Sequence, residues 1–231
     1  MTSFVELREE ALAANLALPA HGLVTLTWGN ASVADHAHGA VAIKPSGVAY
    51  EELTAADMVV LDLDGRVLEG HLAPSTDTPT HIALYRAFPE IGAVVHTHST
   101  SATAWCQAQR EIPLYGTTHA DLCACPIPLT RSLTPDELEA GYELHTGTVL
   151  VEAIRQWGPD LLPCALVRGH APFAWGRTAA AAVKNAVTLE EVARMALLTE
   201  TLAPDARPLD PALRDKHHDR KHGAGAYYGQ R

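Results

Sequence analysis

Three histidines beside apolar segments are the side chains in this sequence most suited to chemistry. His96 and His98 stand two residues apart in AVVHTHST, and His170 follows another apolar run in VRGHAPFAWG. Because side chains alternate along a strand, the first two imidazoles should point to the same side of an extended segment. Catalytic zinc usually takes three protein ligands and leaves one position open. The spacing alone is a weak indication of such a site, since a chain with 13 histidines contains an HxH pair easily by chance.

A second segment, APSTDTPTHIALYRAF, predicts the start of a helix. Asp77 or Thr78 is its expected cap, and Pro79 is the expected first helical residue. Free amides at a helix start bind phosphate, so the neighbouring hydroxyls of Ser75 and Thr76 could complete half of an anion site. Capping alone is the simpler interpretation. For Asp77 the cap is also the safer of two roles, the other being a carboxylate close to a metal.

A third segment, KPSG, ends a predicted strand in a turn. Its lysine, Lys44, would supply a point charge, and Gly47 permits close approach of a ligand, although the segment could be only a turn. The simplest interpretation of Asp121 is a turn residue, and that of Tyr228 is a packing residue. Each could instead transfer protons if it were anchored near a cation. A solvated basic patch is the expected role of the last histidines, His217, His218 and His222.

The composition excludes several functional classes. The 231 residues are 47% hydrophobic and 19% charged, which predicts one folded domain spanning 1–231. A formal net charge of −10 disfavours nucleic acid as a partner. The first 22 residues lack the regions of a signal peptide and no stretch of eighteen apolar residues occurs, so we expect a cytoplasmic protein without membrane attachment. The four cysteines, Cys106, Cys123, Cys125 and Cys164, are expected to be reduced and buried. The pair Cys123 and Cys125 could instead bind metal.

The periodicity of the apolar residues predicts alternating helices and strands. A helix over 4–18 should end at Pro19, followed by a strand in LVTLTW (23–28). Asp64 and Gly65 predict a hairpin turn between two strands. Since hairpins and helical connections both occur, we expect an α/β fold of three layers, α/β/α, with a mixed, largely antiparallel central sheet. The other expected strands are 41–44, 58–63, 66–69, 93–97, 124–129 and 165–168, and the other expected helices are 79–88, 100–107, 147–157 and 179–202.

Seven segments together resemble the class II aldolase and epimerase family nearly end to end. They are ANLALPAHGLVTLTWGN, IKPSGV, DTPTH, AFPEIGAVVHTHS, GTTHAD, GHAPFAWG and RKHGAGAYYGQ, in the order found in that family. The three histidines are shared by the wider family, whereas Asp77, GTTHAD and the two-tyrosine tail favour its epimerase branch. The resemblance implies a class II aldolase-like fold.

The resemblance also implies a metal and a phosphate site. One Zn²⁺ per subunit would be held by His96, His98 and His170, with Asp77 as a ligand or near-ligand, although such donors would also accept Mn²⁺ or Co²⁺. A phosphate cradle and pocket wall are implied for a further set of residues: Ser46, Gly47, Ser75 and Thr76 in the cradle, with Lys44 and Asn30 lining the pocket.

Two acid/base groups are implied to come from a neighbouring subunit of a homotetramer. These are Asp121 and Tyr228, and the residues expected to help around the site are Thr117, Glu143 and His217. This chain departs from the family pattern in three places. Thr76 replaces a serine, His145 replaces an acid, and Arg168-Gly169 replaces a His-Ser pair.

The activity implied is a metal-dependent 4-epimerisation that interconverts L-ribulose 5-phosphate and D-xylulose 5-phosphate, in L-arabinose or related pentose catabolism. The carbon to be inverted bears no acidic C–H, so the C3–C4 bond would break and re-form, with a metal stabilising the charge that develops and two proton-transfer groups on opposite faces. No GxGxxG is present and no nicotinamide is expected. Four alternatives stay open: a class II aldolase, an epimerase of another pentulose phosphate such as L-xylulose 5-phosphate, a non-catalytic scaffold like the adducin head, and a structural-zinc module.

Overall fold

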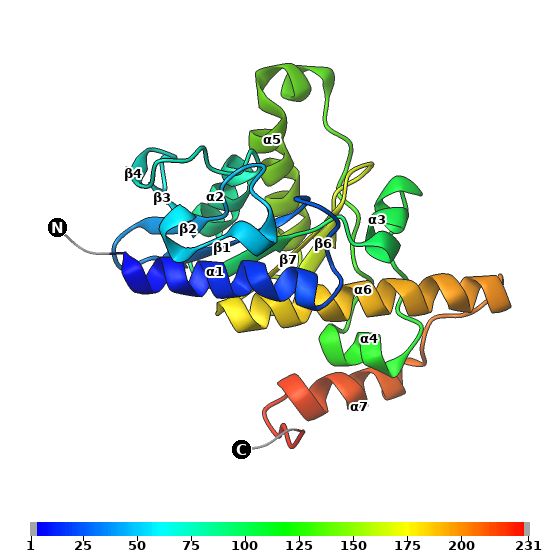
Figure 1. Cartoon of the computed structure of the whole chain (residues 1–231). Helices are drawn as coiled ribbons and strands as arrows, with labels where there is room; N and C mark the ends of the chain where they lie inside the picture. Colours follow the sequence, from blue (N-terminus) through cyan, green and yellow to red (C-terminus); the bar gives the residue numbers. More distant parts are fainter. Residues whose placement is uncertain (1–3, 229–231) are drawn as a thin grey trace.

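A seven-stranded antiparallel sheet forms the centre of the protein (Figure 1), as seen in a computed structural model that describes residues 4–228. The strands lie in the order β4-β3-β2-β1-β5-β7-β6. The strands are β1 Asn30–Asp35, β2 Ala40–Ile43, β3 Val59–Asp62, β4 Val67–Glu69, β5 Ala93–His96, β6 Cys164–Leu166 and β7 Pro172–Gly176. The helices are α1 Val5–Ala20, α2 Thr78–Ala87, α3 Thr100–Gln107, α4 Thr117–Leu122, α5 Pro135–Arg155, α6 Ala179–Leu202 and α7 Pro211–His222, with short 3₁₀ turns η1 Tyr50–Glu52 and η2 Ala55–Asp57.

Helices cover both faces of the sheet, which gives the expected three layers. In Figure 1, α1 and α6 cross one face, and α2 and α5 lie on the other. Consecutive residues of β1 meet opposite layers, as strand alternation requires. Asn15 of α1 exchanges hydrogen bonds with the backbone of Ala31 at 2.8 and 2.9 Å, whereas the next residue, Ser32, contacts the hydroxyl of Tyr85 in α2 at 2.7 Å. The central strand β1 is therefore fixed from both sides.

The prediction of a largely antiparallel sheet is confirmed. Every pair of named strands is antiparallel. We expected a mixed sheet, but parallel pairing within residues 4–228 is limited to one bridge, between Leu129 and Leu166. The expected strand at 124–129 is wrong, because that segment pairs only through this bridge and one between Ile112 and Ile127.

The expected strand at 23–28 is also wrong, and the reason lies in the backbone. Leu26 and Gly29 have φ values of 54° and 88°, which an extended strand excludes. The strand starts instead at Asn30. Helix α1 continues through Pro19 to Ala20, and α5 begins at Pro135 rather than at 147. The helices and strands that sequence patterns missed are β1, β7, α4 and α7.

Residues 211–228 make contacts within the same chain. Helix α7 packs against α4, and the amides of Tyr227 and Tyr228 both donate to the carbonyl of Arg220. The guanidinium of Arg220 lies over the ring of Tyr228 at 4.8 Å. These contacts explain why two aromatics follow a polar helix. All four cysteines are buried and free of disulfides, as expected. No helix among residues 4–228 is long and apolar enough to span a bilayer.

Candidate metal centre and substrate pocket

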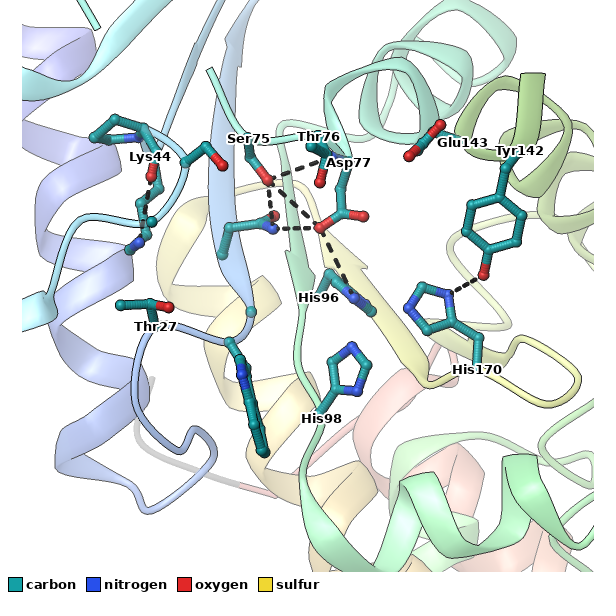
Figure 2. A pocket seen from close by; sticks show the side chains of 16 residues that line it. Thr27, Lys44, Ser75, Thr76, Asp77, His96, His98, Tyr142, Glu143 and His170 are labelled. Carbon is teal, nitrogen blue, oxygen red and sulfur yellow. Dashed lines mark hydrogen bonds and ion pairs between the residues drawn. The ribbon is translucent and has the colours of Figure 1, made fainter. Parts of the chain in front are cut away.

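A pocket of about 630 Å³ opens where β1 begins and β5 ends (Figure 2). Asn30, the first residue of β1, lies opposite His96, the last residue of β5, in the antiparallel register. The start of α2 and the middle of α5 close the pocket from above these strands. Its lining combines imidazole, carboxylate, hydroxyl and lysine side chains: Thr27, Trp28, Gly29, Asn30, Lys44, Pro45, Ser46, Gly47, Ser75, Thr76, Asp77, His96, His98, Tyr142, Glu143 and His170.

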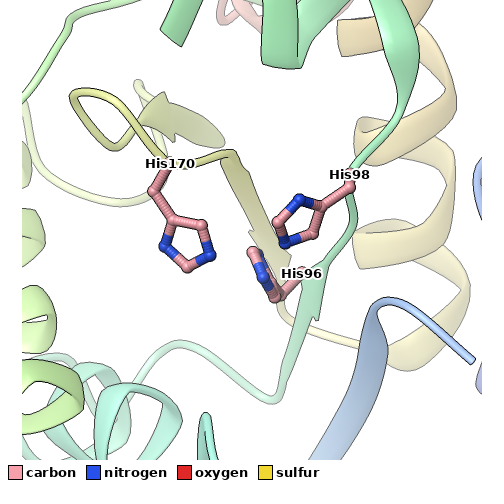
Figure 3. Close-up of side chains that lie close together, drawn as sticks. All are labelled: His96, His98 and His170. Carbon is pink, nitrogen blue, oxygen red and sulfur yellow. The ribbon is translucent and has the colours of Figure 1, made fainter. Parts of the chain in front are cut away.

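The three predicted histidines converge in this pocket (Figure 3). Their ring centroids are 5.0 to 5.1 Å apart in each pair, and one nitrogen from each ring lies within 4.8 Å of the others. His96 and His98 project from the end of β5, and His170 comes from the turn before β7. The prediction that the first two point to the same side is therefore confirmed.

Two of the imidazoles already use Nδ1, which leaves Nε2 free. His96 Nδ1 lies 3.0 Å from the carbonyl oxygen of Pro172, and His170 Nδ1 lies 2.9 Å from the hydroxyl of Tyr142. Metal-binding histidines almost always have such a partner on the second nitrogen. The ring of Phe173 stacks on His96 with centroids 4.2 Å apart and fixes its plane.

Burial keeps the triad neutral. Desolvation lowers the pKa of His96 and of His98 below the ordinary value, and it lowers the pKa of His170 to about 4. Neutral imidazole is the form that binds metal. At neutral pH the three rings are thus ready to act as ligands without losing a proton.

Asp77 turns its carboxylate into the pocket rather than onto the helix. It stands at the N-cap position of α2 but its side chain makes no capping hydrogen bond. Its Oδ2 accepts from Asn30 Nδ2 at 2.7 Å and lies 3.9 Å from His96 Nε2. Burial raises the pKa of Asp77, but the nearby imidazoles of His96 and His81 and the hydrogen bond from Asn30 bring the pKa below its ordinary value. The interpretation of Asp77 as a simple cap is wrong.

The residues present fit a divalent metal. Neutral imidazoles with unused nitrogens face one another, and a carboxylate held ionised stands at their edge. Asn30 adds a buried Oδ1 without a hydrogen-bond partner among residues 4–228. Imidazole with carboxylate suits Zn²⁺ and also Mn²⁺ or Co²⁺. A thiolate site is not formed by the described cysteines, since the one group of three or more possible ligands found among residues 4–228 is the histidine triad.

The predicted phosphate residues line the opposite wall of the same pocket. Ser46 N donates to Ala73 O and Ser75 N donates to Lys44 O, so these two amides join the loops to each other. Within the described chain the amides of Gly47 and Thr76 donate to no atom. Gly47 has φ 71° and open space where a Cβ would stand. Two free amides beside three hydroxyls suit an anion.

Lys44 lies almost fully buried beneath this wall. Its Nζ donates to Val48 O at 2.7 Å and to Pro45 O at 3.3 Å, and it stands 4.9 Å from the centre of the Tyr50 ring. Desolvation lowers the pKa of Lys44. One of its three N–H donors remains for a ligand.

Asp121, Tyr228, Thr117 and His217 do not line this pocket within one chain. They lie on α4, on α7 and just beyond it. Asp121 accepts from Arg220 Nε at 3.0 Å and lies 3.3 Å from Lys221 Nζ and from His217 Nδ1. Burial raises the pKa of Asp121, but the hydrogen bond from Arg220, the charge of Lys221 and the hydrogen bond with His217 lower it below the ordinary value. Glu143, in contrast, faces the metal pocket.

Five pocket residues were missed by sequence analysis: Thr27, Trp28, Gly29, Pro45 and Tyr142. The hydroxyl of Tyr142 lies 2.9 Å from His170 Nδ1, and the ring of Trp28 lies 6.4 Å from that of His98. Gly141 directly before Tyr142 was the available signal, because an isolated glycine in a helical pattern marks a possible break.

The departures from the family pattern lie outside the pocket lining, apart from Thr76. His145 Nδ1 approaches Glu137 Oε1 at 4.0 Å. Arg168 donates to Thr130 O at 3.3 Å and to Gln109 Oε1 at 2.9 Å. Neither side chain lines the pocket of the triad.

Comparison with known proteins gives matches along nearly the whole chain. The profile of the Class II Aldolase and Adducin N-terminal domain matches residues 9–197. A protein of Salmonella paratyphi A (strain ATCC 9150 / SARB42) named L-ribulose-5-phosphate 4-epimerase UlaF is 52% identical over 226 residues, or 98% of this chain and 99% of that protein. A protein of Salmonella typhi with the same name has the same identity and coverage.

Solved structures share the fold. An L-fuculose 1-phosphate aldolase superposes with a TM-score of 0.82 at 21% identity, covering 95% of this chain and 97% of that one. The l-fuculose-1-phosphate aldolase of Thermus thermophilus superposes with a TM-score of 0.66 at 26% identity, covering 88% and 98%. The expected class II aldolase-like fold is confirmed by these likenesses.

Proposed function

The chain belongs to the class II aldolase and adducin N-terminal domain family, and from that premise we propose that it is a metal-dependent L-ribulose-5-phosphate 4-epimerase. It would interconvert L-ribulose 5-phosphate and D-xylulose 5-phosphate in L-arabinose or related pentose catabolism in the cytoplasm. The names of relatives at 52% identity over nearly the full length support this substrate.

One observation carries the proposal. The free nitrogens of three neutral histidines converge in the same pocket as two unpaired amides and a buried lysine. A phosphorylated sugar needs both features, a metal for its hydroxyketone oxygens and an anion site for its phosphate. The 630 Å³ of the pocket matches the range of small-molecule sites.

His96, His98 and His170 would hold the metal, with Asp77 as ligand or near-ligand. A bound Zn²⁺ would supply Lewis-acid stabilisation of the negative charge that develops on the C2 and C3 oxygens, a contribution of several kcal/mol. Asn30 holds Asp77 in place through a 2.7 Å hydrogen bond and offers its own Oδ1 to the sugar. Phe173 and Pro172 keep His96 in its orientation.

The reaction would proceed by cleavage and re-formation of the C3–C4 bond. A base removes the proton of the C4 hydroxyl, the C3–C4 electron pair moves toward the C2 carbonyl, and C4 becomes the aldehyde of glycolaldehyde phosphate. The phosphate would keep this fragment in the pocket while the three-carbon fragment, C1 to C3, also stays bound. The residues that would hold the phosphate are Ser46, Gly47, Ser75 and Thr76. Rotation of the aldehyde exposes its other face, and bond formation with reprotonation of the C4 oxygen gives the epimer. Two proton-transfer groups on opposite faces are required.

Asp121 and Tyr228 are the proposed proton-transfer groups, and we place them in the pocket of a neighbouring subunit of a homotetramer. They lie away from the metal pocket of their own chain, so a second copy must supply them. The charge network of Asp121 with Arg220 and Lys221 keeps it ionised and ready to accept a proton. Thr117, His217 and Glu143 would support the site, Glu143 from the subunit that holds the metal.

The test is incubation of Zn²⁺-loaded protein with L-ribulose 5-phosphate and measurement of D-xylulose 5-phosphate. Chelated protein and His98→Asn should lose the activity. His38→Asn is the matched control, because His38 is an exposed histidine whose partner is Asp35. Activity with L-xylulose 5-phosphate instead would change the substrate, and accumulation of free aldehyde would indicate an aldolase. Absence of any product with metal bound would overturn the proposal.

A further inference from the structure

Tyr142 makes a side-chain hydrogen bond to a metal-site histidine. Its hydroxyl oxygen lies 2.9 Å from His170 Nδ1, and the two rings are 5.8 Å apart (Figure 2). His96 uses a backbone carbonyl for the same purpose, and no partner for His98 Nδ1 is found within residues 4–228. The orientation of His170 therefore depends on a side chain that mutation can remove cleanly.

A break in helix α5 brings Tyr142 to this place. Gly141 has φ 151° and ψ 100°, which is not helical, so the helix restarts in a new direction just before Tyr142. An L side chain rarely adopts such a φ. The kink turns Tyr142 and Glu143 toward the pocket, where a continuous helix over the same residues would have pointed them elsewhere.

The segment after the kink is held against α2. Thr80 of α2 donates its hydroxyl to the carbonyl of Glu143 at 2.6 Å. At Gly147 a Cβ would lie 2.5 Å from the Cβ of Ala83, so only glycine permits this close contact between the helices. Helix α2 also carries Asp77 at its start. Tyr142 is thus positioned by the same packing that positions the carboxylate of the site.

The hydrogen bond fits both neutral forms of His170. A neutral imidazole has one N–H, and either nitrogen can hold it. With the proton on Nδ1, His170 donates to the oxygen of Tyr142 and Nε2 is free to bind a metal. With the proton on Nε2, the hydroxyl donates to Nδ1 and Nε2 cannot bind. When Nε2 binds a metal, the proton is on Nδ1 and the hydroxyl of Tyr142 accepts the hydrogen bond.

We propose that Tyr142 is a positioning residue that holds the ring of His170 with Nε2 available to the metal, and that the kink at Gly141 places it there. The proposal rests on the proposed metal site. It assigns to Tyr142 no contact with the reacting atoms. Its effect appears in the affinity for the metal and in the ligand field around it.

The test compares Tyr142→Phe with wild type and with Tyr115→Phe, which removes a hydroxyl bonded to Glu200 at 2.9 Å on α6. Zn²⁺ affinity is measured by chelator competition and the ligand field by Co²⁺ absorption. We expect about 10- to 100-fold weaker Zn²⁺ binding and an altered Co²⁺ spectrum for Tyr142→Phe alone. In the metal-free proteins, the unfolding midpoint of Tyr142→Phe should differ from that of wild type by no more than the midpoint of Tyr115→Phe does.

Nitrogen NMR of wild type gives a test that needs no variant. In the Zn²⁺-loaded protein, His170 should carry its proton on Nδ1, and this proton should exchange slowly with water. Equal Zn²⁺ affinity and identical Co²⁺ spectra for wild type and Tyr142→Phe would overturn the inference while leaving the metal site intact. Wild type that binds neither metal would remove the metal site and this inference with it.

Discussion

The backbone of Gly29 lies close to the carbonyl oxygen of His96. A Cβ at position 29 would lie 2.7 Å from that oxygen, closer than real Cβ atoms approach other atoms, and 3.2 Å from the Cα of Thr97, which is a tight contact. Gly29 also has φ 88°, a conformation that favours glycine. The loop that carries Trp28 into the pocket is therefore joined closely to the strand that carries two of the metal-site histidines.

Gly29→Ala should lower the free energy of unfolding more than Gly22→Ala does. Gly22 shares the positive φ, at 67°, but has nothing within 4 Å of a Cβ. Both variants carry a backbone cost of about 1–2 kcal/mol, and only Gly29→Ala adds a steric cost, about 1–3 kcal/mol. Urea unfolding of the metal-free proteins measures the difference. Equal losses of stability would show that the loop can move away from His96 without cost.

The metal-free protein should lose stability as the pH falls from about 6.5 toward 4. Burial lowers the pKa of His81 to about 3 and those of His119 and His170 to about 4. Below the ordinary histidine pKa of 6.5 the unfolded chain takes up these protons and the folded chain does not. The stability is thus fully present above pH 6.5, and each histidine removes up to about 1.4 kcal/mol per pH unit as the pH falls.

Urea midpoints at pH 7.5, 6.5, 5.5 and 5.0 in a chelator measure this loss. Excess Zn²⁺ should reduce the part of this stability loss that comes from protonation of His170, but not the parts that come from His81 and His119. A midpoint that stays constant from pH 7.5 to 5.0 without metal would contradict the burial of these imidazoles in neutral form.

Thr76 should behave like serine in the phosphate cradle. Thr76→Ser keeps the hydroxyl, so its KM should stay close to that of wild type, whereas Thr76→Val removes the donor at nearly unchanged shape. Loss of a hydrogen bond to a charged group costs about 1.5–3 kcal/mol, or about 10- to 100-fold in KM. Steady-state kinetics with L-ribulose 5-phosphate, and inhibition by inorganic phosphate, give the two readouts. A fall in kcat at constant KM would assign Thr76 to the reacting end of the sugar instead.

Much of the site followed from local patterns. The alternation of side chains places His96 and His98 on one side of β5, and a glycine turn after β2 leaves Gly47 open for a ligand. These features depend on neighbours along the chain, which periodicity and turn residues report. The helices α2, α3 and α6 were likewise predicted within two residues of their observed ends.

What local patterns missed depends on distant contacts or unusual backbone angles. Asp77 leaves its capping role because Asn30, 47 residues away, binds its carboxylate. Tyr142 follows the non-helical Gly141 in a part of α5 that lies before residue 147, where the predicted helix began. The strand was predicted in LVTLTW and not at Asn30, where β1 begins. Nothing in the sequence shows that Leu26 has a positive φ, because leucine rarely adopts one.

The proposed sharing of one pocket between two copies predicts complementation of two inactive variants. His98→Asn should lack the metal side of a site and keep its own Asp121, whereas Asp121→Asn should keep the metal and lack the acid/base side. In a closed ring of mixed subunits, each site combines one chain's triad with its neighbour's Asp121. Since half of the subunits supply each intact part, about a quarter of the sites in an equal mixture should be complete.

The measurement is epimerase activity after co-refolding of the two variants, compared with each variant refolded alone. Recovery near a quarter of wild-type activity would support a site built by two chains. A double variant, His98→Asn with Asp121→Asn, mixed with wild type is the matched control, because it supplies neither intact part. Activity of the mixture no greater than the average of its components, with mixed oligomers present by native mass spectrometry, would place both groups in the same chain. Such an outcome would require α4 and α7 to move toward the triad, since Asp121 does not line the pocket of its own chain.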